Sequence, residues 1–517
     1  MNIIYNTCNS DPWIIVANEL LSKYNIKPVY WIGYDDDNSE ELVKQYFPEI
    51  VYHKYFDAWK GIFPEKATGN KEQLIDIDFL KDYSSFELQA LRMMDRMDPD
   101  QHSFSVIERQ RHFRNILRNW NAVIENLKPE AVISAIIPHR VYDYALFLLC
   151  NFKKIPFLSF KNTAFTGRII PVTGIYNIEP SITADYHDLK GKLDSPSLMD
   201  SLPKDIYQEY HKVKKDYSIA EPQYMKRHIQ SSRNDSSLIG ITKKFIGRVY
   251  ANKKLFFGKN GYILKGIPTY LKRKNSSIEK SSASILHHAL RKHRNNRFKQ
   301  QLKKHYESLV ESPQYDENYI FLPLHYQPEM TSNPSGDIFV DQFLCIDTLS
   351  SGIPNNYKIY VKEHKAQFYA HTEGHTSRIK EFYDDLVKFP NIKLISLEED
   401  VFELISNSVA VATVTGTAGW EAMVRAKPVI IFGLAWYEGY EGVLKIRNQN
   451  DANNIQSFIE NFSFNENNLL TYLLAFSKNS TRAYYYKGLK GKMNQPEKEC
   501  IDNLASEIEN MLCSEKV

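Results

Sequence analysis

The first 160 residues alternate between short apolar runs and longer segments whose apolar positions recur with helical spacing. We expect buried strands at residues 2–5, 28–32, 131–137 and 156–160. Helices are predicted between them, at residues 13–24, 104–127 and 142–152. Because strands that alternate with helices pair in parallel, this half of the chain predicts an α/β domain built on a parallel sheet.

The C-terminal half shows the same alternation more regularly. Apolar runs predict strands at residues 319–324, 358–362, 392–396, 408–414 and 428–432. Helical segments are expected at residues 337–349, 376–388, 401–406 and 419–425. Connections of this kind join parallel strands by right-handed crossovers. We therefore expect a second α/β domain, followed by a mostly helical tail.

A chain of 517 residues is too long for one ordinary domain. The pattern places Rossmann-like domains at residues 1–200 and 313–464. Residues 201–312 are expected to form a basic, mainly helical insertion between them, and residues 465–517 a set of C-terminal helices. The predicted fold class is α/β with two Rossmann-like domains.

Polar and glycine-rich residues gather where the predicted C-terminal strands end. His325 follows the first of these strands, Glu363 and His364 end the second, and residues 415–419 follow the fourth. In open α/β sheets, ligands bind beyond the carboxyl ends of the strands. These residues therefore predict a substrate cleft.

The segment 413–421, TVTGTAGWE, is the clearest local signal. The amides at the start of the helix that it opens can bind a phosphate, helped by the helix dipole. Glu421 would accept hydrogen bonds from ribose hydroxyls. The alternative is a tight turn with threonine caps. We assign four residues of this turn to a donor nucleotide: Thr415, Gly416, Thr417 and Ala418.

His364 and Glu363 are candidate reactive groups. A histidine at a strand end can donate to a phosphate oxygen and balance its charge. Glu363 can act as a general acid or base if burial raises its pKa. The alternatives are a core histidine for His364, and for Glu363 a salt bridge to Lys362 or Lys365.

Composition narrows the cellular setting. Apolar residues make up 43% and charged residues 25% of the chain, as in soluble globular proteins. We find no signal-peptide pattern at the N-terminus and no apolar stretch long enough to span a membrane. The five cysteines are scattered, which argues against structural zinc and disulfides and favours a cytoplasmic protein.

Charge is distributed unevenly along the chain. Residues 223–304 contain 21 Lys or Arg, and their only acids are Asp235 and Glu279, which makes a net charge of +19. Since the whole chain carries +3, the remainder carries −16. Basic residues interleaved with aromatic ones suit an anionic membrane surface, here the inner face of the cytoplasmic membrane. The alternative is a helical insertion with a basic outer face, and no motif supports nucleic acid binding.

Four motifs occur in the order found in a known family. They are Gln342-Phe-Leu-Cys-Ile-Asp347, Glu363-His364, Gly416-Thr-Ala-Gly-Trp-Glu-Ala422 and Lys427-Pro-Val-Ile-Ile-Phe-Gly433. Over residues 320–437 the chain resembles the bacterial capsule polysaccharide synthesis family, which includes retaining β-Kdo transferases. The chain departs from the family pattern at Lys365, where the family usually has proline.

The resemblance implies a GT-B fold, in which the two domains face a cleft, and a CMP-activated ulosonic acid such as CMP-Kdo as donor. It makes Asp347 the candidate nucleophile, Glu363 the acid/base and His364 a ligand of the donor phosphate. Gln342 would orient the sugar or the nucleophile. The reaction would be a double displacement that retains configuration. On an ideal helix Gln342 and Asp347 lie about 140° apart, so an unbroken helix points them in different directions.

The acceptor, a capsule-type or lipopolysaccharide-type glycan, would bind the N-terminal domain across the cleft. The candidates for contact with it are His139, Arg140, Lys161 and Arg168. We expect no obligatory metal and no cofactor. Two rival functions fit the same layout: a transferase of polyol phosphate from a CDP-alcohol, and a non-catalytic polysaccharide assembly protein.

Overall fold

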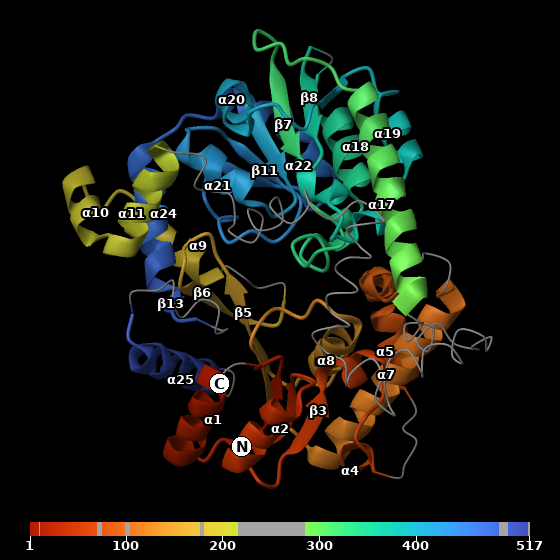
Figure 1. Cartoon of the computed structure of the whole chain (residues 1–517). Helices are drawn as coiled ribbons and strands as arrows, with labels where there is room; N and C mark the ends of the chain where they lie inside the picture. Colours follow the sequence, from red (N-terminus) through yellow and green to blue (C-terminus); the bar gives the residue numbers. More distant parts are fainter. Residues whose placement is uncertain are drawn as a thin grey trace, which may run out of the picture.

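The computed structural model describes residues 1–9, 11–69, 75–98, 104–175, 180–215, 285–354, 356–484 and 495–514. The chain forms two α/β domains, each built around its own sheet. In Figure 1 the N-terminal sheet lies in the lower half and the C-terminal sheet in the upper half. The predicted pair of Rossmann-like α/β domains is confirmed.

The N-terminal sheet has the strand order β13-β6-β5-β4-β1-β2-β3. Its parallel strands are β1 (Asn2–Asn6), β2 (Lys27–Gly33), β3 (Val51–Lys54), β4 (Ala131–Ser134) and β5 (Phe157–Asn162). β6 (Arg168–Thr173) pairs antiparallel with β5, and β13 (Thr481–Arg482) pairs antiparallel with β6. The apolar pattern missed β3, β6 and β13. β6 is antiparallel because residues 163–167 form a turn too short for a crossover to a parallel strand.

Three helices of this domain match the predicted ones within two residues: α1 (Asp11–Tyr24), α7 (Val106–Leu127) and α8 (Val141–Phe152). α7 begins at a capping box, in which Ser105 and Glu108 each accept a hydrogen bond from the other's amide. Its buried Trp120 donates to the carbonyl of Tyr142 at the start of α8. The remaining helices are α2 (Asp37–Tyr46), α3 (Tyr55–Trp59), α4 (Glu65–Thr68), α5 (Ile77–Asp82), η1 (Ser84–Phe86), α6 (Glu87–Met93), η2 (Met94–Met97), α9 (Pro180–Leu189), α10 (Ser195–Ser201) and α11 (Lys204–Lys215).

The C-terminal sheet is parallel, with the order β12-β11-β10-β7-β8-β9. The chain runs outward from β7 to β9 and then returns to β10 on the other side of β7, so the strand order reverses there. Open α/β sheets form their binding crevice at such a reversal. The apolar pattern predicted the first five strands and missed β12. The strands are β7 (Tyr319–Pro323), β8 (Lys358–Lys362), β9 (Ile392–Ile395), β10 (Ala410–Thr413), β11 (Val429–Ile431) and β12 (Val443–Lys445).

Two predicted helices of this domain differ from the observed ones. The helix expected at residues 337–349 is divided at Asp341, whose carboxylate accepts from the amide of Phe343 and starts a new helix. The helix expected at residues 376–388 begins only at Lys380. The helices are η4 (Asp337–Val340), α18 (Gln342–Gly352), η5 (Lys365–Phe368), η6 (Gly374–Thr376), α19 (Lys380–Leu386), α20 (Val401–Asn407), α21 (Thr417–Val424), α22 (Gln449–Asn453) and α23 (Ile455–Asn461).

The last part of the chain returns to the N-terminal domain (Figure 1). α24 (Glu466–Lys478) packs on α9, β13 joins the N-terminal sheet, and α25 (Glu497–Ser514) packs on α1. Phe165, in the turn after β5, contacts the rings of Trp420, Trp436 and Phe476, with centroids 5.0 to 5.5 Å apart. This aromatic cluster joins the two domains.

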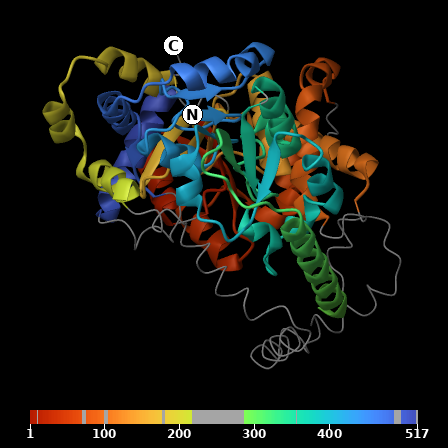
Figure 2. The ribbon, with the colours of Figure 1, turned by 90° about the horizontal axis from the view of Figure 1, so that it is seen from above.

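Of the basic segment at residues 223–304, the structure describes residues 285–304, which belong to α17 (Ile285–Ser308), the long green helix of Figures 1 and 2. Lys299 is buried, and its ammonium donates to the carbonyls of Tyr369 and Thr372, both at 2.6 Å. This cation therefore packs α17 onto the C-terminal domain. The rest of the segment lies outside the described residues, and its contact with a membrane stays a prediction.

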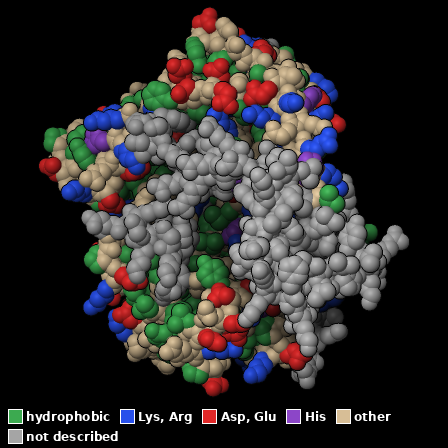
Figure 3. All heavy atoms as spheres, viewed as in Figure 1, with side chains coloured by type: hydrophobic (Ala, Val, Ile, Leu, Met, Phe, Trp, Pro, Cys, Tyr) green, Lys and Arg blue, Asp and Glu red, His purple; other side chains and the backbone are tan. Residues whose placement is uncertain are grey.

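The described surface carries charges of both signs, and acidic side chains gather at the top of the C-terminal domain (Figure 3). This agrees with the net charge of −16 outside the basic segment. Within the described part of the chain, no helix has the length and apolar character needed to cross a membrane.

Replacing Phe165 by alanine should weaken the junction between the domains. The ring is buried, so its removal leaves a cavity in the aromatic cluster and should cost about 3 to 5 kcal/mol of unfolding free energy. Chemical denaturation followed by tryptophan fluorescence measures this loss. Phe56→Ala is the matched control, because Phe56 is 49% exposed and its truncation should cost much less. Equal losses in the two variants would show that the cluster does not stabilise the protein.

Candidate active site between the domains

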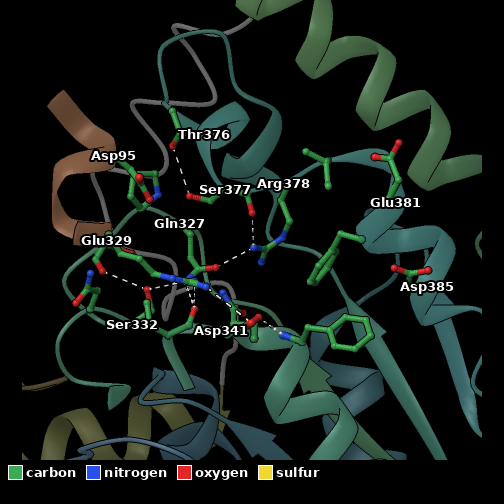
Figure 4. A pocket seen from close by; sticks show the side chains of 18 residues that line it. Asp95, Gln327, Glu329, Ser332, Asp341, Thr376, Ser377, Arg378, Glu381 and Asp385 are labelled. Atoms are coloured by element: carbon green, nitrogen blue, oxygen red, sulfur yellow. Dashed lines mark hydrogen bonds and ion pairs between the residues drawn. The ribbon is translucent and has the colours of Figure 1, made fainter. Parts of the chain in front are cut away.

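A cavity of about 480 Å³ lies between the two domains, within the size range of small-molecule sites (Figure 4). The N-terminal domain contributes Arg92 from α6 and Asp95 from η2. The C-terminal domain contributes the loop after β7, the start of α18 and the segment that enters α19: Gln327, Pro328, Glu329, Ser332, Asn333, Val340, Asp341, Gln342, Phe343, Thr376, Ser377, Arg378, Ile379, Glu381, Phe382 and Asp385.

Hydrogen bonds across the interface hold α6 and η2 against the loop after β7. The side-chain amide of Gln89 donates to the carboxylate of Asp337 at 2.8 Å. The backbone carbonyl of Gln89 accepts from the side-chain amide of Asn333 at 3.1 Å. Arg96 donates to the carbonyl of Pro328 at 3.2 Å. The cavity is therefore formed by both domains and depends on how they meet.

Two glutamines fix the backbone of the loop after β7. The Gln342 side chain accepts from the amide of His325 at 2.8 Å and donates to its carbonyl at 3.0 Å. The Gln367 side chain pairs with the backbone of Gln327 in the same way, at 3.1 and 3.2 Å. Gln342 thus shapes the loop through its backbone, and it also lines the cavity.

His325 joins the ends of β7 and β10. Its Nε2 lies 3.0 Å from the hydroxyl of Thr413 and accepts from the amide of Thr415 at 3.3 Å. Burial, with smaller contributions from His364 and Arg378, lowers the pKa of His325 to about 3. The ring is therefore neutral near pH 7, and because its Nε2 accepts, its proton lies on Nδ1.

The turn before α21 is closely packed against His325. A Cβ atom at Gly416 would lie 3.0 Å from the ring of His325, and one at Gly419 only 2.1 Å from the hydroxyl of Tyr437. The Thr415 hydroxyl donates to the carbonyl of Thr331 at 2.6 Å. These two glycines are thus required by packing, as the tight-turn alternative expects. Along α21, Thr417 is exposed at the first position, Ala418 is half-buried and Glu421 is buried.

Glu363 forms a buried ion pair with Arg378, whose Nε donates to the carboxylate at 2.8 Å. The carboxylate also accepts from the hydroxyl of Tyr383 and from the amide of His364, both at 2.8 Å. The alternative prediction, a salt bridge from Glu363 to Lys362 or Lys365, is wrong, because Glu363 pairs with Arg378 instead. Lys362 donates to the carbonyl of Leu397, and Lys365 lies 3.3 Å from the carboxylate of Glu398.

His364 caps the short helix η5, because its Nδ1 accepts from the amide of Ala366 at 3.1 Å. Burial lowers its pKa to about 4, although the adjacent Glu363 acts in the opposite direction. The neutral ring therefore carries its proton on Nε2, which is a donor suited to a phosphate oxygen.

The structure separates the two ends of the Gln342–Asp347 motif. α18 runs without interruption from Gln342 to Gly352. Gln342 is buried at the cavity, whereas Asp347 is exposed and does not line it. This is the separation expected on an unbroken helix.

Glu329 is a carboxyl that sequence reasoning did not select. It lines the cavity, accepts from the hydroxyl of Thr331 at 3.2 Å, and has its pKa raised by burial. The sequence signal that could have identified Glu329 is its position shortly after the strand β7. The sequence did not show that the loop folds into the space between the domains.

The N-terminal candidates fall into two groups. His139 and Arg140 precede α8, and both amides donate to the carboxylate of Asp143, at 3.1 and 2.7 Å. The Arg140 guanidinium lies 4.5 Å from the ring centroid of Tyr55. Burial lowers the pKa of His139 well below its ordinary value, and the nearby Arg140 and Arg96 add to this effect. His139 and Arg140 therefore lie close to Arg96, which binds the loop after β7 across the interface.

Lys161 links the domains, whereas Arg168 joins β6 to α11 and α24. The ammonium of Lys161 donates to the carbonyl of Leu434, and burial lowers its pKa to about 7. Arg168 is 5% exposed, forms an ion pair with Asp205 at 2.6 Å and donates to the carbonyl of Ser477. The structure does not bring Arg168 into the cavity.

Two Rossmann-like domains that face a shared cavity form the GT-B arrangement, one of the folds of glycosyltransferases. Residues 270–461 match the model of a family described as capsule polysaccharide biosynthesis protein. The resemblance to this family is confirmed over that segment, and the chain resembles a GT-B enzyme of capsule polysaccharide synthesis. No curated protein sequence matches the chain.

Several solved structures are similar to parts of the chain. The β-Kdo 2,4 transferase KpsC of Thermosulfurimonas dismutans is 14% identical, covers 74% of this chain and 88% of its own, and has a TM-score of 0.31. The β-Kdo 2,7 transferase of the same protein is 17% identical, with coverages of 44% and 67% and a TM-score of 0.24. UDP-GlcNAc 2-epimerase of Methanocaldococcus jannaschii is 13% identical, with coverages of 89% and 92% and a TM-score of 0.22. Scores this low carry no argument about function.

The protonation of His364 predicts a pH dependence of stability. The folded protein keeps this ring neutral down to about pH 4, whereas the unfolded chain takes up a proton near pH 6.5. The stability that it contributes is complete above about pH 6.5 and is lost below it, by up to about 1.4 kcal/mol for each pH unit. His364→Asn keeps an acceptor for the amide of Ala366 and removes the titration. Its free energy of unfolding, measured by denaturation between pH 7 and pH 5, should therefore fall less steeply than that of the wild type. If the unfolding free energies of the two proteins fall equally steeply with pH, the lowered pKa of His364 is contradicted.

Proposed function

We propose that the protein is a glycosyltransferase of capsule synthesis that moves a sugar from a CMP-activated donor, a ulosonic acid such as Kdo, to a glycan acceptor. The observation that carries the proposal is the cavity between the domains. Its wall is built mainly from the loop after β7, the start of α18 and the residues in and before α19, all inside the segment that matches the capsule polysaccharide biosynthesis family.

In this proposal the donor nucleotide binds beyond β7, β8 and β10. The Nε2 hydrogen of neutral His364 and the amides of Thr417 and Ala418 at the start of α21 donate to its phosphate. Both are fixed donors, so they stabilise the charge that develops as CMP leaves. Glu421, buried in α21, accepts from the ribose. The support is positional, since these groups follow neighbouring strands of one sheet.

The carboxyl that we assign to the chemistry is Glu329. A general acid or base needs a pKa nearer to the working pH than an exposed carboxyl has, and burial raises the pKa of Glu329. In this role it accepts the proton of the acceptor hydroxyl as the new glycosidic bond forms. Asp347, the nucleophile implied by the family motif, is exposed and outside the cavity. Glu363 is held by Arg378, so we assign it to positioning that guanidinium.

The acceptor is proposed to approach from the N-terminal domain, where Arg92 lines the cavity and His139 and Arg140 lie near Arg96. Because Lys161 and Arg168 bind groups of the protein itself, we assign Lys161 to holding the domains together and Arg168 to packing α11 and α24 on β6. A capsule acceptor at the inner face of the cytoplasmic membrane would place the enzyme at that surface.

Incubation with activated donors tests the reaction class. Purified protein should release CMP from CMP-Kdo in the presence of a glycan acceptor, and CDP-glycerol should not be consumed. Release of CMP is measured chromatographically. CMP release from CDP-glycerol alone would replace the proposal with polyol-phosphate transfer. No turnover of any activated donor, with the fold intact, would favour a non-catalytic assembly protein.

Substitution of the carboxyls tests the assignment of Glu329. Glu329→Gln removes the proton acceptor with little change in shape and should reduce transfer by about a hundredfold or more. Asp347→Asn is the matched control and should leave the rate nearly unchanged, because Asp347 is exposed. Rates are compared at saturating donor, with CMP binding as the check of folding. Loss of transfer in Asp347→Asn, with activity kept in Glu329→Gln, would return the reactive role to Asp347.

A further inference from the structure

A row of aromatic rings follows β3, at the edge of the N-terminal sheet where its parallel strands end. Tyr55, Phe56 and Trp59 belong to α3, and their ring centroids lie 5.1 to 6.0 Å apart. The rings of Phe56 and Trp59 are nearly parallel, with an interplanar angle of 11°. Ligands of open α/β sheets bind beyond this edge of the sheet, so the row lies where a binding site is expected.

The outer end of the row is accessible to a ligand. Phe56 is 49% exposed, whereas Tyr55 and Trp59 are half-buried. Tyr34, which follows the neighbouring strand β2, is 48% exposed. The amide of Phe56 donates to the carboxylate of Asp35 at 2.8 Å, so the segments after β2 and β3 are joined and carry their exposed rings on neighbouring loops. Exposed apolar surface that gathers in one place marks a contact site more often than scattered single side chains do.

The inner end of the row lies next to the cavity between the domains. The guanidinium of Arg140 lies 4.5 Å from the ring centroid of Tyr55. Arg140 is near Arg96, whose pKa is lowered by burial and by the charge of Arg140. Arg96 in turn donates to the carbonyl of Pro328 at 3.2 Å, and Pro328 lines the cavity. A chain-like ligand whose end occupies the cavity can therefore continue along the row.

Charge at the outer end of the row disfavours an anionic ligand. Residues 35–37 are all aspartate, and Asp57 lies within α3. Lys54 pairs with Asp37 at 2.7 Å, and Lys60 lies near enough to Asp35 to lower its pKa, although burial raises that pKa more strongly. Among the described side chains around this end of the row, carboxylates therefore outnumber ammonium groups. A ligand that packs on these rings should be uncharged.

A neutral sugar ring meets these conditions. One face of a pyranose presents several C–H groups, which pack on an aromatic ring, and its hydroxyls point outward to hydrogen-bonding groups around it. The carboxylate of Asp35 and the ammonium of Lys60 supply such groups beside the row. Aromatic side chains combined with a few polar groups are the usual lining of small-molecule sites.

We propose that Phe56 and Trp59 form a platform for a neutral sugar of a glycan chain, outside the cavity between the domains. The platform binds an internal sugar of the chain rather than the sugar that reacts, and so it holds the glycan while the end of the glycan lies between the domains. The proposal deepens the proposed function, on which it rests for the glycan being the acceptor.

The test applies the full-length protein to an array of neutral and acidic oligosaccharides and then titrates the strongest neutral ligand by isothermal titration calorimetry. The wild-type protein should bind neutral oligosaccharides. Phe56→Ala should weaken this binding about three- to tenfold, because one ring contact is lost. Phe56→Tyr keeps the ring and should retain the affinity. Tyr46→Ala is the matched control and should bind like the wild type, because Tyr46 is 44% exposed in α2 and lies outside the row.

Absence of binding to every neutral oligosaccharide of the array would overturn the proposal. So would equal affinities of the wild type and Phe56→Ala, or equal losses in Phe56→Ala and Tyr46→Ala. Sedimentation with vesicles of phosphatidylglycerol and phosphatidylethanolamine is measured in parallel. A loss of vesicle binding in Phe56→Ala, with sugar binding unchanged, would assign the exposed rings to a lipid surface instead.

The failure of this proposal is distinguishable from that of the proposed function, because binding to the array needs no activated donor. A protein that consumes CMP-Kdo but binds no neutral oligosaccharide keeps its reaction and loses the platform. A protein that binds neutral oligosaccharides through Phe56 but consumes no activated donor keeps the platform and loses the reaction.

Discussion

The buried ion pair between Glu363 and Arg378 holds three separate segments of the candidate site in one arrangement. Glu363 follows β8, Arg378 precedes α19, and the same guanidinium binds Gln327 in the loop after β7. Burying two charges costs several kcal/mol unless further hydrogen bonds satisfy them. Here Tyr383 and the amide of His364 supply those bonds to the carboxylate. The shape of the cavity therefore follows from one pair of charges and its partners.

The reversal of strand order at β7 decides which residues can cooperate. β7 lies between β8 and β10, so the loops that follow these three strands open at the same edge of the sheet. His325 and Thr415 are 90 residues apart in the chain and are joined by a hydrogen bond across this edge. Neutral histidines after β7 and β8, together with the start of α21, give this edge several fixed hydrogen-bond donors. Fixed donors in a water-poor site are the usual means of stabilising a leaving phosphate.

The N-terminal domain completes the site. Arg92 and Asp95 close one side of the cavity, and Gln89 and Arg96 bind the loop after β7. On another part of the interface, α24 and the cluster around Phe165 join the domains. A site that exists only where the domains meet is shaped by both of them and can open by a movement of one domain against the other.

The amino-acid sequence by itself determined the central strands of both sheets and the long helices α1, α7 and α8, because apolar periodicity and capping are local properties. The capping box of Ser105 and Glu108 at the start of α7 is an example. The pattern missed the strands β3, β6, β12 and β13. The sequence also located the strand-end residues His325 and His364. It did not determine the antiparallel pairing of β6 with β13, since that depends on where the end of the chain packs. Nor did it show that Glu329, in the loop after β7, is the carboxyl that lines the cavity, whereas Asp347 of α18 is not. Only the tertiary structure decided that one enters the cavity and the other faces solvent, because the closure of α6 and η2 over the loop after β7 defines which side chains are enclosed.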